Sequence, residues 1–272
     1  MDLKKINKIV WWIPFRSIRD KFRWMLIKYY DLEIFDERSE KRFLELYNTF
    51  MDKNEELRDN RFEMKWEYRI LNLYDNTVTT EINLYKTLYI TWISRILSEI
   101  KPKKHVDIAS HFVNVILPIS AFVDIDFYDI RPVVPPFEIK GLKCIDGNIT
   151  NLDIASNSVE SISSFSVIEH IGLERYGDPF DPKGDIKAIN ELVRVTKSGG
   201  NIFISLPIAS KAIIQYNGHR VYIPSMIIEY FKGCHLKDFK WISENKEIID
   251  DINSVHTENI YWCEGLFWFV KD

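Results

Sequence analysis

The stretch ELVRVTKSGGNIFISLP, residues 191–207, carries the end of an amphipathic helix into a buried strand. The helix is expected over Lys183 to Val195, because apolar residues recur there at helical spacing: Ile186, Ile189, Leu192 and Val193. Lys197-Ser198-Gly199-Gly200 has the composition of a turn, and the short apolar run from Asn201 to Leu206 predicts a strand. A helix that leads directly into a buried strand is typical of an α/β protein.

The same alternation extends outward from this stretch, starting at residue 104. Six further strands are predicted, at 105–109, 121–128, 142–145, 159–165, 236–243 and 259–270. Two further helices are expected, at 112–119 and 225–231. Strands that alternate with helices predict a mainly parallel sheet flanked by helices.

The first hundred residues read differently, as a helical extension. Phe43, Leu44, Leu46, Tyr47 and Phe50 recur at helical spacing, and Asn83 to Ile100 predicts a second helix that ends at Lys101-Pro102. We therefore expect an extension over residues 1–100 and an α/β domain over residues 101–272. The extension is expected to cover the domain and to cap its site.

Residues 1–30 are basic and rich in tryptophan. They hold eight Lys and Arg against two Asp, a net charge of +6, so the remaining residues must carry −10 to give the total of −4. Trp beside Lys and Arg is typical of a bilayer interface, and an amphipathic helix docked on the body explains the pattern equally well. The acidic body gives no support to nucleic-acid binding.

Composition favours a cytoplasmic protein, with peripheral contact at the inner membrane face left open by residues 1–30. The three cysteines, Cys144, Cys234 and Cys263, are far apart and form no CxxC pair, which indicates a reducing compartment. No apolar run approaches the roughly 20 residues that a membrane-spanning helix needs.

In a parallel sheet, ligands bind outside the carboxyl ends of the strands, so the residues that follow each strand are candidate ligand contacts. An acidic residue after the second strand can accept hydrogen bonds from ribose hydroxyls, and one after the third can accept from an adenine amine. The candidates for cofactor binding are Asp107, Ala109, Ser110, Asp129, Ile130, Asp146, Gly147, Asn148, Ser164 and Phe165.

The segment SVIEHIGLERYGDPFDPKGD, residues 166–185, follows the fourth strand and concentrates polar groups that suit acid–base chemistry. A second polar group, Asn217-Gly218-His219-Arg220, follows the next strand. We expect catalysis from Glu169, His170 and His219, and substrate contacts from Tyr176, Asp178, Asp181 and Arg220.

These motifs carry a family resemblance. The order DIAS, YDIRP, DGN, SVIEHIG and ELVRVTKSGGNIFISLP resembles motifs one to five of class I methyltransferases, and the RYGDPFDPKGD stretch resembles a domain-of-unknown-function family first described from nematodes and also found in bacteria. The resemblance spans roughly Val106 to Tyr222 and implies a Rossmann-like, seven-stranded sheet that binds S-adenosylmethionine. DIASHF departs from the pattern, because it lacks the glycines of the first loop.

The leader IVWWIPFRSIRDKFR resembles a short segment of bacterial enzymes of surface-polysaccharide assembly. That resemblance points to a small-molecule or sugar acceptor, carried on a nucleotide or a lipid. A hydroxyl acceptor needs a base, and a neutral imidazole at His170 or His219 suits that task.

Other uses of the same residues remain open at this stage. Glu169, His170 and His219 can hold a divalent metal ion, as a similar Glu-His pair with a later His does in some O-methyltransferases, or the histidines can be structural. A catalytically inactive methyltransferase fold serving as a scaffold or regulatory partner at the membrane is the competing interpretation. An NAD-dependent enzyme is disfavoured, because no GxGxxG follows the first strand.

Overall fold

The computed structural model describes Phe22 and residues 37–56, 83–131, 133–215, 218–243, 247–256 and 262–272. The chain divides into two compact units, Met1–Glu81 and Ile82–Asp272. Within the first unit, α3 (Glu37–Glu56) forms the helix predicted around Phe43 to Phe50. The expected bilayer contact of residues 1–30 lies, apart from Phe22, outside the described residues. None of the described helices has the length and apolar character needed to cross a membrane.

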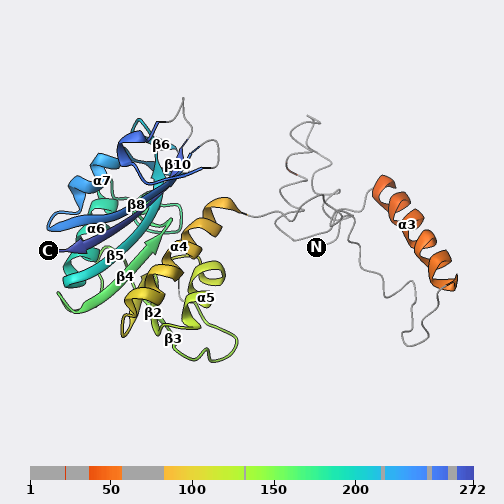
Figure 1. The fold of residues 1–272 in the computed structure, drawn as a ribbon, viewed down its shortest axis with the longest axis horizontal. Coiled ribbons are helices and arrows are strands. Elements are labelled where there is room, and N and C mark those ends of the chain that lie inside the picture. The colour runs from red at the N-terminus through yellow and green to blue at the C-terminus, as the bar shows by residue number, and fades with distance from the viewer. Residues whose placement is uncertain are drawn as a thin grey trace. The chain divides into compact units, whose positions relative to one another are not determined.

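The second unit is built on one mixed, mostly parallel sheet (Figure 1). The seven predicted strands all form, and β9 is an eighth that pairs antiparallel with the end of β8, so the sheet has eight strands among the described residues where seven were predicted. The spatial order is β3-β2-β1-β4-β5-β10-β8-β9, and β10 is antiparallel to both of its neighbours. The strands are β1 (His105–Ile108), β2 (Ile125–Asp129), β3 (Leu142–Asp146), β4 (Val159–Phe165), β5 (Thr196–Ile208), β8 (Cys234–Ile242), β9 (Ile248–Ile249) and β10 (Cys263–Lys271).

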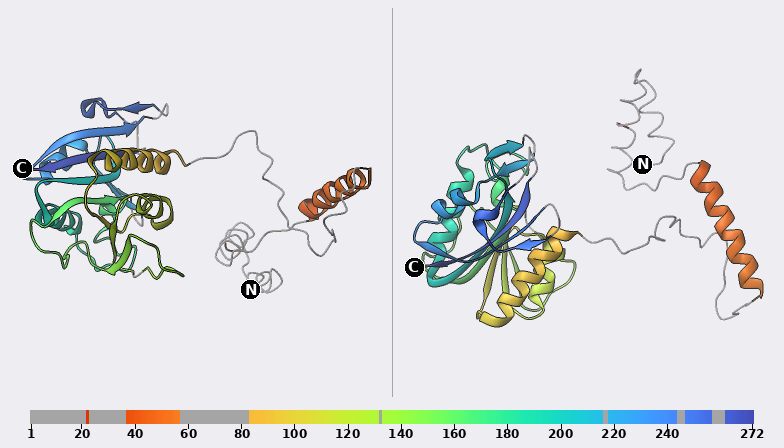
Figure 2. Two further views of the ribbon diagram at one scale, coloured as in Figure 1. Left: turned by 60° about the horizontal axis from the view of Figure 1, so that its bottom comes forward. Right: turned by 45° about the horizontal axis from the view of Figure 1, so that its top comes forward.

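Helices cover both faces of the sheet (Figures 1 and 2). α4 (Leu84–Ile100), the π-helical turn η2 (Phe112–Ile116) and α5 (Leu117–Ser120) pack on one face, in one hydrophobic cluster. α6 (Gly184–Val195) and α7 (Pro224–Tyr230) pack on the other. A small hairpin of β6 (Ile213–Gln215) and β7 (His219–Val221) stands beside the main sheet, and the short 3-10 turns are η3 (Ile168–His170) and η4 (Ile252–Ser254).

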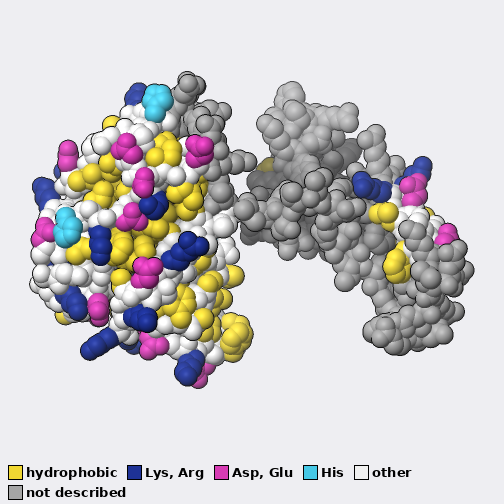
Figure 3. All heavy atoms as spheres, in the orientation of Figure 1, with side chains coloured by type: hydrophobic (Ala, Val, Ile, Leu, Met, Phe, Trp, Pro, Cys, Tyr) yellow, Lys and Arg dark blue, Asp and Glu magenta, His cyan; other side chains and the backbone are white. Residues whose placement is uncertain are grey.

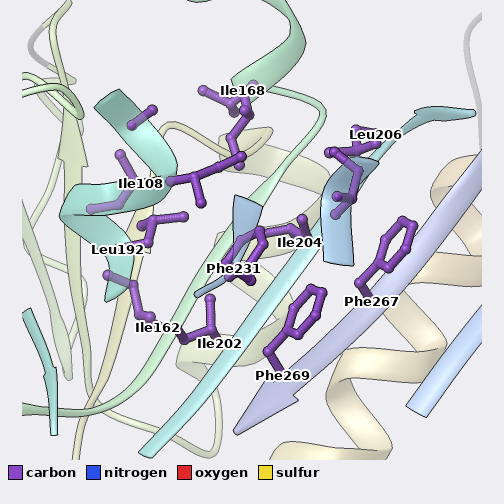
Figure 4. Close-up of a cluster of buried hydrophobic side chains, with 14 of the residues drawn as sticks. Ile108, Ile162, Ile168, Leu192, Ile202, Ile204, Leu206, Phe231, Phe267 and Phe269 are labelled. Carbon is purple, nitrogen blue, oxygen red and sulfur yellow. The ribbon is translucent and has the colours of Figure 1, made fainter. Parts of the chain in front are cut away.

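The core follows the two-residue period of strands that are buried on both sides. In β10, Phe267 and Phe269 join the cluster under α6 and α7, whereas Leu266 joins the cluster under α4. Figure 4 shows Leu192 of α6 and Phe231 among the isoleucines of β1, β4 and β5. This two-sided burial fixes the register, because a slip of one residue would exchange the two faces.

α4 belongs to the α/β unit and not to the extension. Asn83 caps its start by accepting a hydrogen bond from the Lys86 amide, and Lys101 ends it in a left-handed conformation just before Pro102. Ile93 and Leu97 are fully buried in the cluster beneath the helix. The division of the chain therefore falls between Glu81 and Ile82, ahead of this helix, and not at residue 100.

The sheet contains a switch in strand order between β1 and β4. The chain builds outward from β1 to β3 and then returns to build β4 and β5 on the other side. Crossovers on the two sides of such a switch leave a crevice at the carboxyl ends of the strands. The crevice is where the candidate site lies.

Candidate functional site

A cavity of about 610 Å³ opens at the carboxyl ends of β1, β2, β3 and β4. We distinguish two ends of it. The β1–β3 end is formed by Ala109, Ser110, Asp129, Ile130, Gly147 and Asn148, and the β10 end by Tyr85, Tyr89, Ser166, His170, Trp262 and Glu264. The volume falls within the range of small-molecule sites.

Asp107 at the end of β1 organises the β1–β3 end without facing the cavity. Its Oδ1 accepts the Ser110 amide at 3.0 Å, and its Oδ2 accepts the Ser110 hydroxyl at 2.7 Å and the Ser163 hydroxyl. Ser110 Oγ in turn accepts the Phe165 amide at 2.9 Å, which joins the loop after β1 to the end of β4. Burial raises the pKa of Asp107 to about 7, against the lowering effect of these hydrogen bonds.

The buried network continues along the sheet through His105. The two ring nitrogens lie 2.8 Å from Ser163 Oγ (Nε2) and from Ser161 Oγ (Nδ1). Because the Ser163 proton goes to Asp107, His105 Nε2–H must donate to Ser163, and His105 Nδ1 accepts from Ser161. Burial lowers the pKa of His105 to about 3, so the ring is neutral. With these hydrogen bonds, the side chains of His105, Ser161, Ser163 and Asp107 all have a partner.

The loop after β1 keeps the backbone path that a glycine would take. Ala109 has φ 56°, in the left-handed region, and its amide donates to Tyr128 O at 2.7 Å. Ala109 therefore replaces the expected glycine at a backbone conformation that alanine adopts only with strain.

Asp129 ends β2 at the cavity wall, where its Oδ1 accepts the Arg131 amide at 2.8 Å. Next to it, Ile130, Gly147 and Asn148 line the same end. Gly147 is required for packing, because a β-carbon there would lie 2.7 Å from the Tyr128 ring. An acidic residue beside apolar walls suits a ribose and its base, so these residues fit a nucleoside cofactor.

Besides Asp107, two further predicted cofactor contacts do not reach the cavity. Asp146 is exposed at the end of β3, and the Ser164 hydroxyl donates to Ile108 O at 3.0 Å, within the sheet. Phe165, by contrast, lines the cavity and stacks on Tyr89 at 5.6 Å between ring centroids.

His170 lies in η3, just past β4, and lines the cavity. Its Nδ1–H donates to Gly218 O at 2.8 Å, which leaves the Nε2 lone pair as the acceptor, 3.4 Å from Arg175 Nη1. Burial lowers the pKa of His170 to about 4, although the hydrogen bond to Gly218 opposes this. The ring is therefore neutral near pH 7, and Tyr176 contacts it edge-on at 5.3 Å.

Residues 171–184, which include most of the RYGDPFDPKGD stretch, form a loop that closes on itself. The Asp181 amide donates to Gly172 O at 3.0 Å, and Gly172 has φ +80°, with no room for a β-carbon beside Asp181 O. Arg220 is buried and donates to Ile171 O at 2.7 Å, so it ties the base of this loop and does not reach the cavity. Tyr176, Asp178 and Asp181 line the cavity.

The β10 end holds residues that the sequence reasoning missed. Tyr85 and Tyr89 come from α4. Glu264 comes from β10, and Trp262 directly precedes that strand. Tyr85 and Trp262 stack at 5.9 Å between ring centroids, and Ser166 Oγ donates to Glu264 Oε1 at 3.0 Å. A charged residue inside the apolar run CEGLFWFV was the signal for Glu264, since a buried carboxyl in a strand needs a reason.

Glu169 and His219 lie behind the β10 end and do not line the cavity. Glu169 is almost fully buried, and Glu169 Oε2 and His219 Nε2 are buried without a hydrogen-bond partner. Burial, and the neighbouring Glu264, raise the pKa of Glu169 well above its usual range.

The structure does not support the alternative of a metal site at Glu169, His170 and His219. Across the described parts of the chain, no group of three or more His, Cys, Asp or Glu is arranged to hold a metal ion. Glu169 Oε1 lies 3.7 Å from His170 Nε2, the His170 and His219 rings are 5.9 Å apart, and His170 Nδ1 is engaged by Gly218.

Residues 145–260 match the model of a family described as "Caenorhabditis protein of unknown function, DUF268". The match covers the loop of residues 171–184 and the β6–β7 hairpin, in line with the resemblance seen in the sequence. No curated protein matches the chain.

Solved structures give weaker likenesses. The YcgJ protein of Bacillus subtilis is 10% identical, with a TM-score of 0.47 over 68% of this chain and 98% of that one. A Thermotoga maritima protein described as an S-adenosylmethionine-dependent methyltransferase is 14% identical, with a TM-score of 0.41 over 70% and 99%. A phosphoethanolamine N-methyltransferase of Haemonchus contortus, solved with S-adenosylhomocysteine, is 11% identical, with a TM-score of 0.44 over 69% and 56%. Similarity this low carries no functional argument, so function must be argued from the cavity itself.

Proposed function

We propose that this protein is an S-adenosylmethionine-dependent methyltransferase that methylates a hydroxyl group of a sugar or another small molecule. The observation that carries the proposal is the cavity at the switch in strand order, with Asp129 ending β2 at its wall and Ala109 holding the left-handed turn after β1. S-adenosylmethionine, when bound, supplies a methyl group on a good leaving group, so the protein mainly has to align the acceptor.

The residues at the β1–β3 end are suited to hold the nucleoside. Asp129 can accept from the ribose hydroxyls, and Ile130 and Ile149 offer apolar surface to the base. Asp107 and Ser110 act from behind, because their hydrogen bonds fix the loop on which Ala109 sits.

His170 is the group placed to take the acceptor's proton. His170 Nε2 would accept the hydroxyl proton as that oxygen receives the methyl group that S-adenosylmethionine supplies when bound. His170 is held for this by its Nδ1–H bond to Gly218, which fixes both the tautomer and the ring plane.

A small acceptor also agrees with the surface of the α/β unit. Figure 3 shows Lys and Arg side chains interspersed with Asp and Glu on the face in view, without a field of one sign. A role in surface-polysaccharide assembly rests on the resemblance of the N-terminal leader. Residues 1–30 would then bring the enzyme to a lipid-linked acceptor at the membrane surface.

Calorimetric titration with S-adenosylmethionine and S-adenosylhomocysteine tests the proposal. We expect saturable 1:1 binding, weakened at least about tenfold by Asp129→Ala, because two ribose hydrogen bonds to a charged group are lost. Asp153→Ala is the matched control, since it removes an exposed carboxylate outside the cavity and should leave the affinity unchanged. Well-folded protein that binds neither compound would refute the proposal and favour the scaffold interpretation.

A further inference from the structure

The β10 end of the cavity combines aromatic rings with a carboxyl group. Tyr85, Tyr89 and Trp262 form walls there, and Glu264 of β10 lines the same part of the cavity. Glu264 is 3% exposed, so it meets the outside only through the cavity that it lines.

A second carboxyl group lies behind the first. Glu169 is 2% exposed, and Glu264 lies close enough to raise its pKa. Among the described residues, neither carboxyl forms an ion pair with a Lys or Arg, and the nearest basic partner of Glu169 is the neutral His170 at 3.7 Å. Arg175 lowers the pKa of Glu169, but less than burial and Glu264 raise it. Two buried acids without a paired cation avoid the cost of burying charge by holding their protons, and a cation bound beside them would favour the ionised form.

Two buried atoms next to the β10 end, on residues that do not line the cavity, have no hydrogen-bond partner. Glu169 Oε2 and His219 Nε2 have no hydrogen-bond partner, whereas nearly all buried polar atoms in proteins do. The His219 ring packs edge-on against Trp262, with 4.9 Å between ring centroids, so it supports the aromatic wall from outside the cavity. The hydroxyl groups that hydrogen-bond to Glu264, those of Ser166 and Ser205, bring no positive charge to it.

We infer that the acceptor carries a protonated amino group, and that this group binds at the β10 end between Glu264 and the rings of Tyr85, Tyr89 and Trp262. An ammonium group supplies the positive charge that the two acids lack, and it is attracted to the faces of aromatic rings. A neutral sugar can donate hydrogen bonds to Glu264 but cannot compensate the negative charge of Glu264 and Glu169 when they are ionised. An anionic group at this end would be repelled by it.

The inference rests on the proposed function and narrows its substrate class to amino sugars and amino alcohols. With the amino group anchored on Glu264, a hydroxyl of the same molecule can face His170, which lines the cavity together with Ser166. The ammonium group is then an anchor, and the hydroxyl is the group that is methylated.

The test uses the full chain saturated with S-adenosylhomocysteine, so that cofactor binding is established separately. Three matched pairs of probes are titrated by calorimetry: glucosamine and glucose, galactosamine and galactose, choline and 3,3-dimethylbutan-1-ol. We expect a cationic member to bind at least about tenfold more tightly than its neutral partner, in the range that a desolvated cation–π and charge contact provides. Equal binding within every pair, or no binding of any cationic probe, would overturn the inference and leave the cofactor result intact.

Two variants locate the site. Glu264→Gln should abolish the preference for the cation while S-adenosylhomocysteine still binds, which shows that the fold is preserved. Glu138→Gln removes an equal charge from the surface between β2 and β3 and should change nothing. Binding of Mg²⁺ or Mn²⁺ that depends on Glu264 and excludes the amines would overturn the inference.

Discussion

The two ends of the cavity differ in how well their polar groups are satisfied. At the β1–β3 end, Asp107, Ser110 and Ser163 are joined in a hydrogen-bond network that is complete within the protein. Behind the β10 end, Glu169 and His219 keep buried atoms without partners. One end is therefore organised before any ligand arrives, whereas the other lacks the charge that a ligand would bring.

The largest effect is expected at His170, on the rate of methyl transfer. His170→Asn can keep a donor toward Gly218 but has no basic nitrogen, so kcat should fall by about 10²–10⁴. The rate is measured by transfer of a labelled methyl group to an acceptor identified among the amino sugars.

Affinity for S-adenosylhomocysteine serves as the internal control of this experiment and should stay within about twofold, since His170 is not part of the β1–β3 end. Full activity in His170→Asn would mean that the ring only positions the acceptor, and that the proton leaves by another route.

The next effect concerns stability at the satisfied end. Asp107→Asn should lower the free energy of unfolding by about 2–3 kcal/mol, because an amide cannot accept all three hydrogen bonds at this buried site. Urea unfolding at pH 7 measures the change. Ser161→Ala, at the far end of the same network, should cost less, about 1 kcal/mol. Equal losses from both would indicate that Asp107 is not the centre of the network.

At the β10 end, removing a buried carboxyl is expected to raise the free energy of unfolding above neutral pH, whereas Asp107→Asn lowers it. Burial raises the pKa of Glu264, so the folded state holds a proton there that the unfolded chain releases at lower pH. Its contribution to stability is therefore complete below the unfolded pKa near 4.5 and is lost as pH rises through the folded value. The pKa of Asp107 is also raised, to about 7, so its contribution to stability likewise falls as pH rises.

Glu264→Gln should flatten this pH dependence and stabilise the protein at pH 8 by on the order of 1 kcal/mol, in contrast to the loss caused by Asp107→Asn. Urea unfolding of both proteins at pH 5 and pH 8 checks the difference. A variant that is less stable at pH 8 would show that Glu264 is already compensated in the free protein.

The sequence predicted the sheet and the β1–β3 end better than the β10 end, for a physical reason. Strands buried on both faces appear as apolar runs, and the residue that follows each strand must lie at the carboxyl edge. That reasoning brings Ala109 and Asp129 to the cavity. It fails for Asp107, Asp146 and Ser164, because the direction of one side chain at the end of a strand depends on local register.

The β10 end could not be assembled in the same way. Tyr85 and Glu264 meet one cavity although nearly the whole α/β unit separates them in sequence. Their meeting depends on the position of antiparallel β10 next to β5, which no local pattern specifies. Arg220 was predicted to contact the substrate because it lies in a polar motif, but its guanidinium donates to Ile171 O and holds the loop instead.

The smallest effect is expected at Ala109, and it sharpens the view of the β1–β3 end as already organised. Ala109→Gly removes a left-handed strain of about 1 kcal/mol but gives the unfolded chain more freedom, so net stability should change by less than about 0.5 kcal/mol. Ala109→Val, with a branched side chain at the same φ, should destabilise by more than the glycine variant changes. Because the backbone already follows the glycine path, S-adenosylhomocysteine affinity in Ala109→Gly should stay within about twofold, as calorimetry can measure. A gain in affinity of about tenfold would instead show that the methyl group of Ala109 obstructs the cofactor. The loop would then have the right backbone conformation but too little space for the ligand.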